Sequence, residues 1–285
     1  MTRLARDRTF RSRDGLRLYY RDYPGPGDRV PVLCLHGLTR SSRDFADLAP
    51  HLAATRRVLC GDVRGRGRSE WDPKPERYAP ATYVEDVAEL LRDAEVPQVV
   101  VIGTSMGGIL AMGLAASHPG ALVGVVLNDI GPVVDPRGLE RIAGYVGKSE
   151  PVSSWAEATR AAQTVHGHAF PDYGPADWER FARRTLREAP DGRLVADYDP
   201  AIAQGLARGT AAPADLWPLF EPLARVPVLV LRGALSDILS SATLAQMAER
   251  HPTLTSVEVP DRGHAPALDE PECLRAIDAF LGSLP

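Results

Sequence analysis

The stretch Gly103-Thr104-Ser105-Met106-Gly107 decides which fold this chain can adopt. An apolar run at residues 99–102 precedes it, and a helix-forming run at residues 108–112 follows it. The order of buried strand, G-x-S-x-G and helix needs a sharp turn, and the two glycines permit it because they carry no Cβ. We expect the Ser105 hydroxyl to lie exposed at the top of a sheet, with the dipole of the next helix aimed at it.

The rest of the chain alternates short apolar runs with amphipathic segments. The apolar runs predict strands at residues 30–35, 58–60, 98–102, 122–127, 226–233 and 254–259. The amphipathic segments between them predict helices at residues 42–53, 82–94, 108–117, 242–250 and 273–281. This alternation predicts an α/β fold, with a mostly parallel sheet and helices on both faces.

The alternation stops between residues 132 and 223, where no strong strand is evident and helical stretches predominate. A segment of this length is too long for an ordinary loop. We therefore expect a core formed by residues 1–131 and 224–285, and a helical cap formed by residues 132–223 over the active edge of the sheet. Candidates for lining a pocket there are Trp155, Trp178, Trp217, Phe170, Tyr173 and, toward a carboxylate, Arg208.

Ser105 becomes a nucleophile only with a base and an orienting acid nearby. His264 follows the last predicted strand in Asp-Arg-Gly-His-Ala, at the same sheet edge as Ser105. Asp237 follows the strand at residues 226–233 and completes the chain order serine, aspartate, histidine, so we favour it as the acid. Asp129, at the end of the strand that follows the Ser105 helix, is the alternative.

Acyl transfer also needs donors for a developing oxyanion. The backbone N–H of Met106, directly after the serine, is one expected donor. The N–H of Leu38 is the other, because the adjacent Gly37 permits close backbone approach, and His36 is expected to be a scaffold residue. His166 and His168 form an H-x-H pair without a third ligand, so we expect no metal.

These features together resemble the α/β-hydrolase superfamily over almost the full chain. The matching positions are His36-Gly37, the block Gly-Asp-Val-Arg-Gly-Arg-Gly-Arg-Ser at residues 61–69, the turn at Ser105, Asp237, and Gly263-His264. The resemblance implies an α/β-hydrolase fold, a Ser-His-Asp hydrolase with a helical cap, and no cofactor.

The residues around the serine narrow the choice within that superfamily. Haloalkane dehalogenases and epoxide hydrolases of this fold carry aspartate in place of Ser105. Carbon–carbon bond hydrolases of aromatic degradation usually carry asparagine before the serine and tryptophan after the histidine, where this chain has Thr104 and Ala265. We therefore predict hydrolysis of a small soluble carboxylic ester or lactone. The alternatives are a carbon–carbon bond hydrolase and a ligand receptor with negligible turnover.

Composition limits the partners of this 285-residue chain. Its formal net charge of -4 gives no reason to expect nucleic acid or an anionic membrane as a partner. We expect no secretory signal and no membrane span, since no apolar run approaches about 20 residues. Three sparse cysteines, Cys34, Cys60 and Cys273, fit a reducing cytoplasm without disulfides. We expect a cytoplasmic monomer or homodimer that acts on a small molecule.

Overall fold

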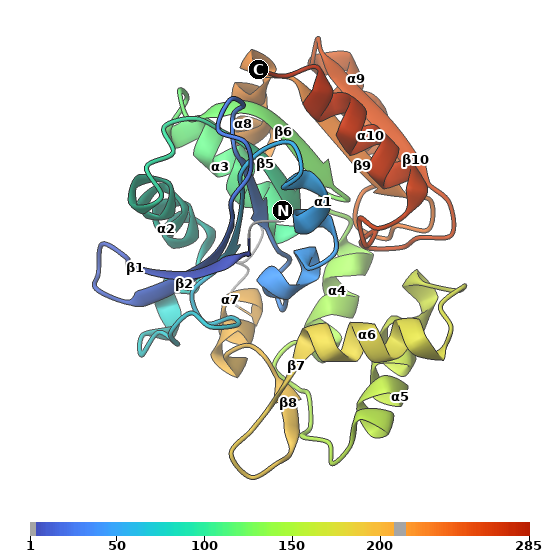
Figure 1. The fold of residues 1–285 in the computed structure, drawn as a ribbon. Coiled ribbons are helices and arrows are strands. Elements are labelled where there is room, and N and C mark those ends of the chain that lie inside the picture. The colour runs from blue at the N-terminus through green and yellow to red at the C-terminus, as the bar shows by residue number, and fades with distance from the viewer. Residues whose placement is uncertain (1–3, 208–214) are drawn as a thin grey trace.

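A computed structural model describes residues 4–207 and 215–285 of the chain, and its centre is a twisted eight-stranded sheet (Figure 1). The strand order is β1-β2-β4-β3-β5-β6-β9-β10, in which β2 pairs antiparallel with both β1 and β4 and all other pairs are parallel. The strands are β1 (Arg6–Arg11), β2 (Arg17–Tyr23), β3 (Val32–Leu35), β4 (Val58–Asp62), β5 (Val99–Thr104), β6 (Leu122–Asn128), β9 (Val228–Gly233) and β10 (Leu254–Val259). The expected α/β-hydrolase architecture is thereby confirmed.

Helices cover both faces of this sheet, because the central strands are apolar on both sides. On one face, Val101 of β5 packs in one cluster with α2 (Pro80–Asp93) and α3 (Met106–Ser117). On the other face, Val100 packs with α1 (Leu48–Leu52) and α10 (Pro271–Gly282). The helix expected at residues 42–53 is divided into the short helix η1 (Ser42–Phe45) and α1. The remaining helices outside residues 132–207 are α8 (Trp217–Phe220), α9 (Ser241–Arg250), η2 (Pro75–Arg77) and η5 (Glu221–Arg225).

The segment between β6 and β9 forms a separate group of elements, seen at the lower end of the molecule in Figure 1. It contains α4 (Pro136–Tyr145), α5 (Trp155–His166), η3 (Gly167–Ala169), α6 (Pro175–Thr185), β7 (Leu186–Glu188), β8 (Leu194–Ala196), η4 (Pro200–Ile202) and α7 (Ala203–Ala207). The sequence predicts no strong strand in this segment, and the structure has two short ones there, β7 and β8, which pair antiparallel. Each has only 3 residues, too few for apolar alternation to reveal it.

The end of this segment packs with the core. Phe220 and Leu223 are buried in the same cluster as α3. Within the described residues, no helix is both long and apolar enough to cross a membrane. The three cysteines are buried and free of disulfides.

Candidate active site

Ser105 lies in the turn between β5 and α3, at the carboxyl edge of the sheet. Its φ of 51° is in the left-handed region, which a non-glycine residue adopts rarely and often at functional sites. The flanking glycines make this turn possible. A Cβ on Gly103 would lie 2.5 Å from the backbone of Gly107, and a Cβ on Gly107 would lie 2.1 Å from the Leu35 carbonyl oxygen.

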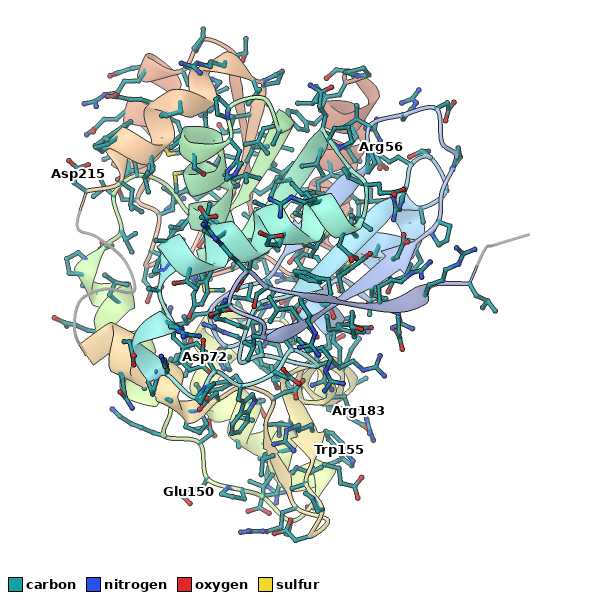
Figure 2. All side chains as sticks on the ribbon, turned by 90° about the vertical axis from the view of Figure 1, so that its left-hand side faces the viewer. Arg56, Asp72, Glu150, Trp155, Arg183 and Asp215 are labelled. Atoms are coloured by element: carbon teal, nitrogen blue, oxygen red, sulfur yellow. The ribbon has the colours of Figure 1, made fainter. Side chains whose placement is uncertain are left out.

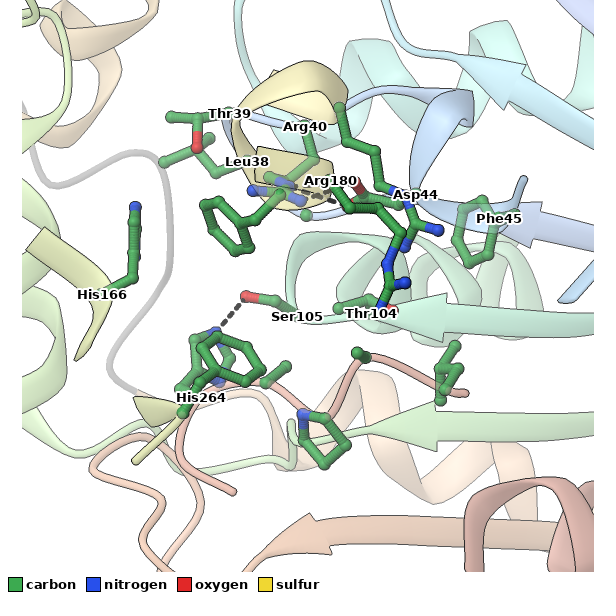
Figure 3. A pocket seen from close by; sticks show the side chains of 18 of the residues that line it. Leu38, Thr39, Arg40, Asp44, Phe45, Thr104, Ser105, His166, Arg180 and His264 are labelled. Atoms are coloured by element: carbon green, nitrogen blue, oxygen red, sulfur yellow. Dashed lines mark hydrogen bonds and ion pairs between the residues drawn. The ribbon is translucent and has the colours of Figure 1, made fainter. Parts of the chain in front are cut away.

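A hydrogen-bonded chain runs from Ser105 through His264 to Asp129. The Ser105 Oγ lies 2.8 Å from His264 Nε2, as the dashed line in Figure 3 marks, and His264 Nδ1 lies 2.8 Å from Asp129 Oδ2. The His264 side chain is 8% exposed and that of Asp129 0%, so water competes little for these bonds. Asp129 also accepts from the Gly233 N–H at 2.8 Å and from the Ser236 hydroxyl at 2.6 Å. These bonds hold its carboxylate in one orientation.

The structure corrects the favoured acid: Asp129, not Asp237, meets His264. Asp237 instead forms a bidentate ion pair with Arg141 of α4, at 2.5 and 2.8 Å. This pair lowers the pKa of Asp237 against the opposing effect of burial. Arg141 was not predictable as the partner of Asp237, because its position beside that carboxylate depends on the packing of α4.

The register of the sheet explains why Asp129 reaches the site. Thr104 of β5 is paired with Asn128 of β6, so Ser105 and Asp129 are the next residues after a matched pair. The Ser105 N–H donates to the Asn128 carbonyl at 3.0 Å, and Asp129 has a left-handed φ of 56°. Asp237 belongs to a longer loop that follows the next strand, β9.

His264 is held from two sides. The preceding Gly263 N–H donates to the Ala169 carbonyl at 2.8 Å, and a Cβ on Gly263 would lie 2.8 Å from the Ala169 Cα. Arg262 binds Glu270 of the core at 2.8 Å and Asp172, of the segment between β6 and β9, at 2.6 Å. The loop that carries His264 is therefore fixed by both parts of the molecule.

The loop after β3 is fixed by two buried side chains. His36 Nε2 accepts from the Val63 N–H at 3.0 Å, which leaves the proton on Nδ1 to be donated to the Gly37 carbonyl at 2.7 Å. Burial lowers the pKa of His36 to about 4, so the ring is neutral at pH 7. Arg66, which is fully buried, donates from Nε to the Leu38 carbonyl at 2.9 Å, and its Nη2 lies 3.7 Å from the Met106 sulfur.

A pocket of about 120 Å³ opens over Ser105 (Figure 3). Its floor is core, including Leu38, Ser105 and His264, and its other walls come from α4, α5 and α6. Of the aromatic residues expected in such a pocket, Phe170 and Tyr173 line it, while Trp178 is buried behind them in contact with both rings. Two other candidates lie elsewhere: Trp155 contacts the Arg183 guanidinium, and Trp217 contacts that of Arg250. The remaining candidate, Arg208, falls outside the described residues.

The charged residues of this pocket are largely paired. Arg40 binds Asp44 through a bidentate contact, seen in Figure 3, and Arg180 binds Asp177 at 2.8 Å. Burial, together with the charge of Arg40, lowers the pKa of His166 to about 3, so this ring is neutral. Within the described ranges, no group of three or more His, Cys, Asp or Glu side chains is arranged to hold a metal ion.

A mostly parallel sheet with a serine turn between strand and helix, and with histidine and aspartate at later loops of the same edge, defines the class of α/β hydrolases. Residues 32–273 match the model of the alpha/beta hydrolase family, and the chain belongs to that family.

Two curated relatives and one solved structure are similar over most of the chain. A 3-hydroxybutyrate-oligomer hydrolase of Cupriavidus necator is 38% identical over 90% of this chain and 89% of its own. A pimeloyl-[acyl-carrier protein] methyl ester esterase of Aeromonas hydrophila is 27% identical over 90% of this chain and 97% of its own. The crystal structure of an alpha/beta hydrolase from Novosphingobium aromaticivorans has a TM-score of 0.93 and 48% identity, covering 98% of each chain. The protein is thus a hydrolase of the α/β fold with esterases among its homologues.

Proposed function

We propose that this chain is a serine hydrolase that cleaves a small carboxylic ester or lactone through an acyl-enzyme on Ser105. The observation that carries the proposal is the hydrogen-bonded chain Ser105–His264–Asp129, with both links at 2.8 Å. An arrangement of nucleophile, base and orienting acid of this kind activates a serine hydroxyl. The relatives support the ester bond as the target, since one of them is a methyl ester esterase.

The first half of the reaction forms the acyl-enzyme. Ser105 Oγ attacks the ester carbonyl while its proton passes to His264 Nε2. The buried Asp129 carboxylate keeps the other ring proton on Nδ1 and stabilises the imidazolium. His264 then gives its proton to the departing alkoxide, which leaves as the alcohol. In the second half, His264 takes a proton from water, and the resulting attack releases the acid and returns the proton to Ser105.

The amides of Met106 and Leu38 are the proposed donors to the oxyanion of each tetrahedral intermediate. Met106 is the first residue of α3, where a backbone N–H has no acceptor within the helix. The Leu38 N–H belongs to the same peptide group as the Gly37 carbonyl, which the neutral His36 holds. Donors fixed in this way need little reorganisation when charge develops, which favours catalysis.

Residues 132–223 act in this proposal mainly as a cap. Their helices supply Ile142, Tyr145 and Phe181 to the wall of the pocket over Ser105. A pocket of about 120 Å³ with mixed polar and apolar walls suits a compact group at the scissile bond. Phe220 and Leu223 also fall within residues 132–223, but they pack on the core. The part of the cap that covers the site therefore ends before Phe220.

The test compares Ser105→Ala with the wild type on p-nitrophenyl butyrate and with a fluorophosphonate label. We expect kcat to fall by roughly 10⁴-fold or more, with loss of labelling. The control is Ser117→Ala, which changes an exposed serine at the far end of α3 and is expected to retain full activity. Full activity in Ser105→Ala contradicts the assignment of Ser105 as the nucleophile. Labelling of the wild type without turnover of any ester indicates a receptor instead.

A further inference from the structure

A second pocket, which we call the α5 chamber, lies within the segment between β6 and β9. Its volume is about 380 Å³, roughly three times that of the pocket over Ser105. The chamber is bounded by α5, by the end of α6, and by the β7–β8 hairpin. In Figure 2 the labelled Glu150, Trp155 and Arg183 mark this end of the molecule, far from Arg56.

One face of α5 gives the chamber an apolar wall. Ala158, Ala161, Ala162 and Val165 line it at positions i, i+3, i+4 and i+7, and therefore share one side of the helix. At 1.5 Å per residue, this wall is about 10 Å long. Three of the four side chains are single methyl groups, which leaves space in front of the helix. Val165 is 39% exposed, so an apolar occupant of the chamber would remove it from water.

The chamber adjoins the pocket over Ser105. The side chains that line both are those of Thr39, Arg40, Tyr145, His166 and Phe181. Three of them form an aromatic partition between the two pockets. The rings of Tyr145 and His166 meet edge to face with centroids 5.3 Å apart, and those of His166 and Phe181 are tilted with centroids 4.9 Å apart.

This partition presents little charge to an apolar chain. Asp44 neutralises Arg40, whose guanidinium lies 4.3 Å from the Phe181 ring centroid. His166 stays uncharged at neutral pH, because burial and the charge of Arg40 lower its pKa. An aliphatic group can therefore pass along the partition without desolvating a free cation.

We propose that the α5 chamber binds an unbranched aliphatic chain of the substrate while the ester carbonyl lies at Ser105. This inference rests on the proposed function and adds a substrate class to it: esters that carry a medium-length alkyl chain on one side of the scissile bond. The pocket over Ser105 then holds the group on the other side of the scissile bond. Because burial of each methylene group is favourable, kcat/KM should rise with chain length until the chamber is filled.

The experiment measures kcat/KM for two series of esters. One series is the p-nitrophenyl esters of acetate, butyrate, octanoate and dodecanoate, and the other is the acetates of ethanol, butanol and octanol. The variant is Ala161→Phe, which places a ring in the chamber from an exposed position of α5. In one of the two series, we expect kcat/KM for the eight-carbon ester, p-nitrophenyl octanoate or octyl acetate, to fall at least tenfold. For the shortest ester of that series, p-nitrophenyl acetate or ethyl acetate, kcat/KM should stay within twofold of the wild type.

The matched control is Ala156→Phe, the same substitution at an exposed position of α5 that lines neither pocket. It is expected to keep the wild-type chain-length profile. Val165→Phe, one turn along the chamber face from Ala161, repeats the test if Ala161→Phe does not fold.

The outcomes separate this inference from the proposed function. The chamber proposal alone is overturned if the kcat/KM of the wild type does not depend on chain length in either series. It is also overturned if Ala161→Phe and Val165→Phe lose kcat/KM equally on short and long esters. Absence of esterase activity in the wild type, or activity that survives Ser105→Ala, overturns the proposed function.

Discussion

Replacement of Asp129 by asparagine tests the structural assignment of the acid most directly. Asp129 Oδ1 accepts from the Gly233 N–H at 2.8 Å, and Oδ2 accepts from both His264 and Ser236. The backbone N–H cannot rotate away, so the single oxygen of asparagine should stay on Gly233. The amide nitrogen then faces His264 Nδ1 and donates to it. This forces the ring proton onto Nε2, where it prevents His264 from accepting the proton of Ser105.

The expected effect follows from the loss of that tautomer. An aspartate-to-asparagine change that keeps the geometry of a serine triad lowers kcat about 10⁴-fold. This corresponds to roughly 5 kcal/mol of activation free energy. Asp237→Asn is the matched control. It breaks an ion pair whose side chains are 29% and 22% exposed, so we expect kcat within about threefold and a stability change of at most about 1 kcal/mol.

The assay is steady-state hydrolysis of p-nitrophenyl butyrate by both variants and the wild type, with thermal unfolding to verify the fold. KM should change little in Asp129→Asn, because the carboxylate does not line the pocket over Ser105. A large loss of kcat in Asp237→Asn with near-normal activity in Asp129→Asn refutes the reasoning. Equal losses in both variants at unchanged stability refute it as well.

Three further predictions concern the framework of the site. Gly107→Ala should lower the free energy of unfolding by roughly 3 kcal/mol in urea titrations, since its Cβ would meet the Leu35 carbonyl, whereas Gly120→Ala, with open space around it, should stay within about 0.5 kcal/mol. The low pKa of His36, about 4 against an ordinary 6.5, favours the neutral ring in the folded state, so its stabilising contribution is complete above pH 6.5 and declines as pH falls toward 4. The loss is about 3 kcal/mol, and unfolding titrations across this range should show a shallower pH dependence in His36→Gln. Arg66→Lys should lower kcat about tenfold with KM within threefold, because lysine cannot hold both backbone carbonyls that the guanidinium binds; an unchanged kcat argues against a positioning role.

Much of this site follows from local sequence patterns. Ser105 directly follows the buried strand β5, and His264 lies in the loop after β10. Both were predictable because the carboxyl ends of parallel strands meet at one edge of a sheet. The turn itself is constrained by contacts that only glycine permits, at Gly103 and Gly107. The constraint at Gly103 acts between residues close in sequence, so the pattern alone carries it, whereas the constraint at Gly107 comes from Leu35 on the neighbouring strand β3.

The carboxylate that binds His264 was not predictable in the same way. Asp129 and Asp237 follow neighbouring strands, β6 and β9, and both satisfy the requirement for a carboxylate at the sheet edge. The choice between them depends on the β5–β6 register and on Arg141, which lies 96 positions from Asp237 along the chain. Side chains so far apart in sequence pair only through tertiary packing, and the amphipathic pattern of a segment does not reveal which distant residue it will contact. The same limit applies to the α5 chamber, which exists only once α5, α6 and the hairpin are packed.

The ion pair between Asp237 and Arg141 has a mechanical consequence. It joins a loop of the core to α4, and the same loop residue contacts the helix closely, since a Cβ on Gly138 would lie 2.4 Å from the Asp237 carbonyl oxygen. This junction holds the start of the segment between β6 and β9 against the core through one charged and one steric contact. Any displacement of α4 away from the core has to release both contacts. This junction therefore fixes the position of α4, whose Ile142 and Tyr145 line the pocket over Ser105, relative to the core.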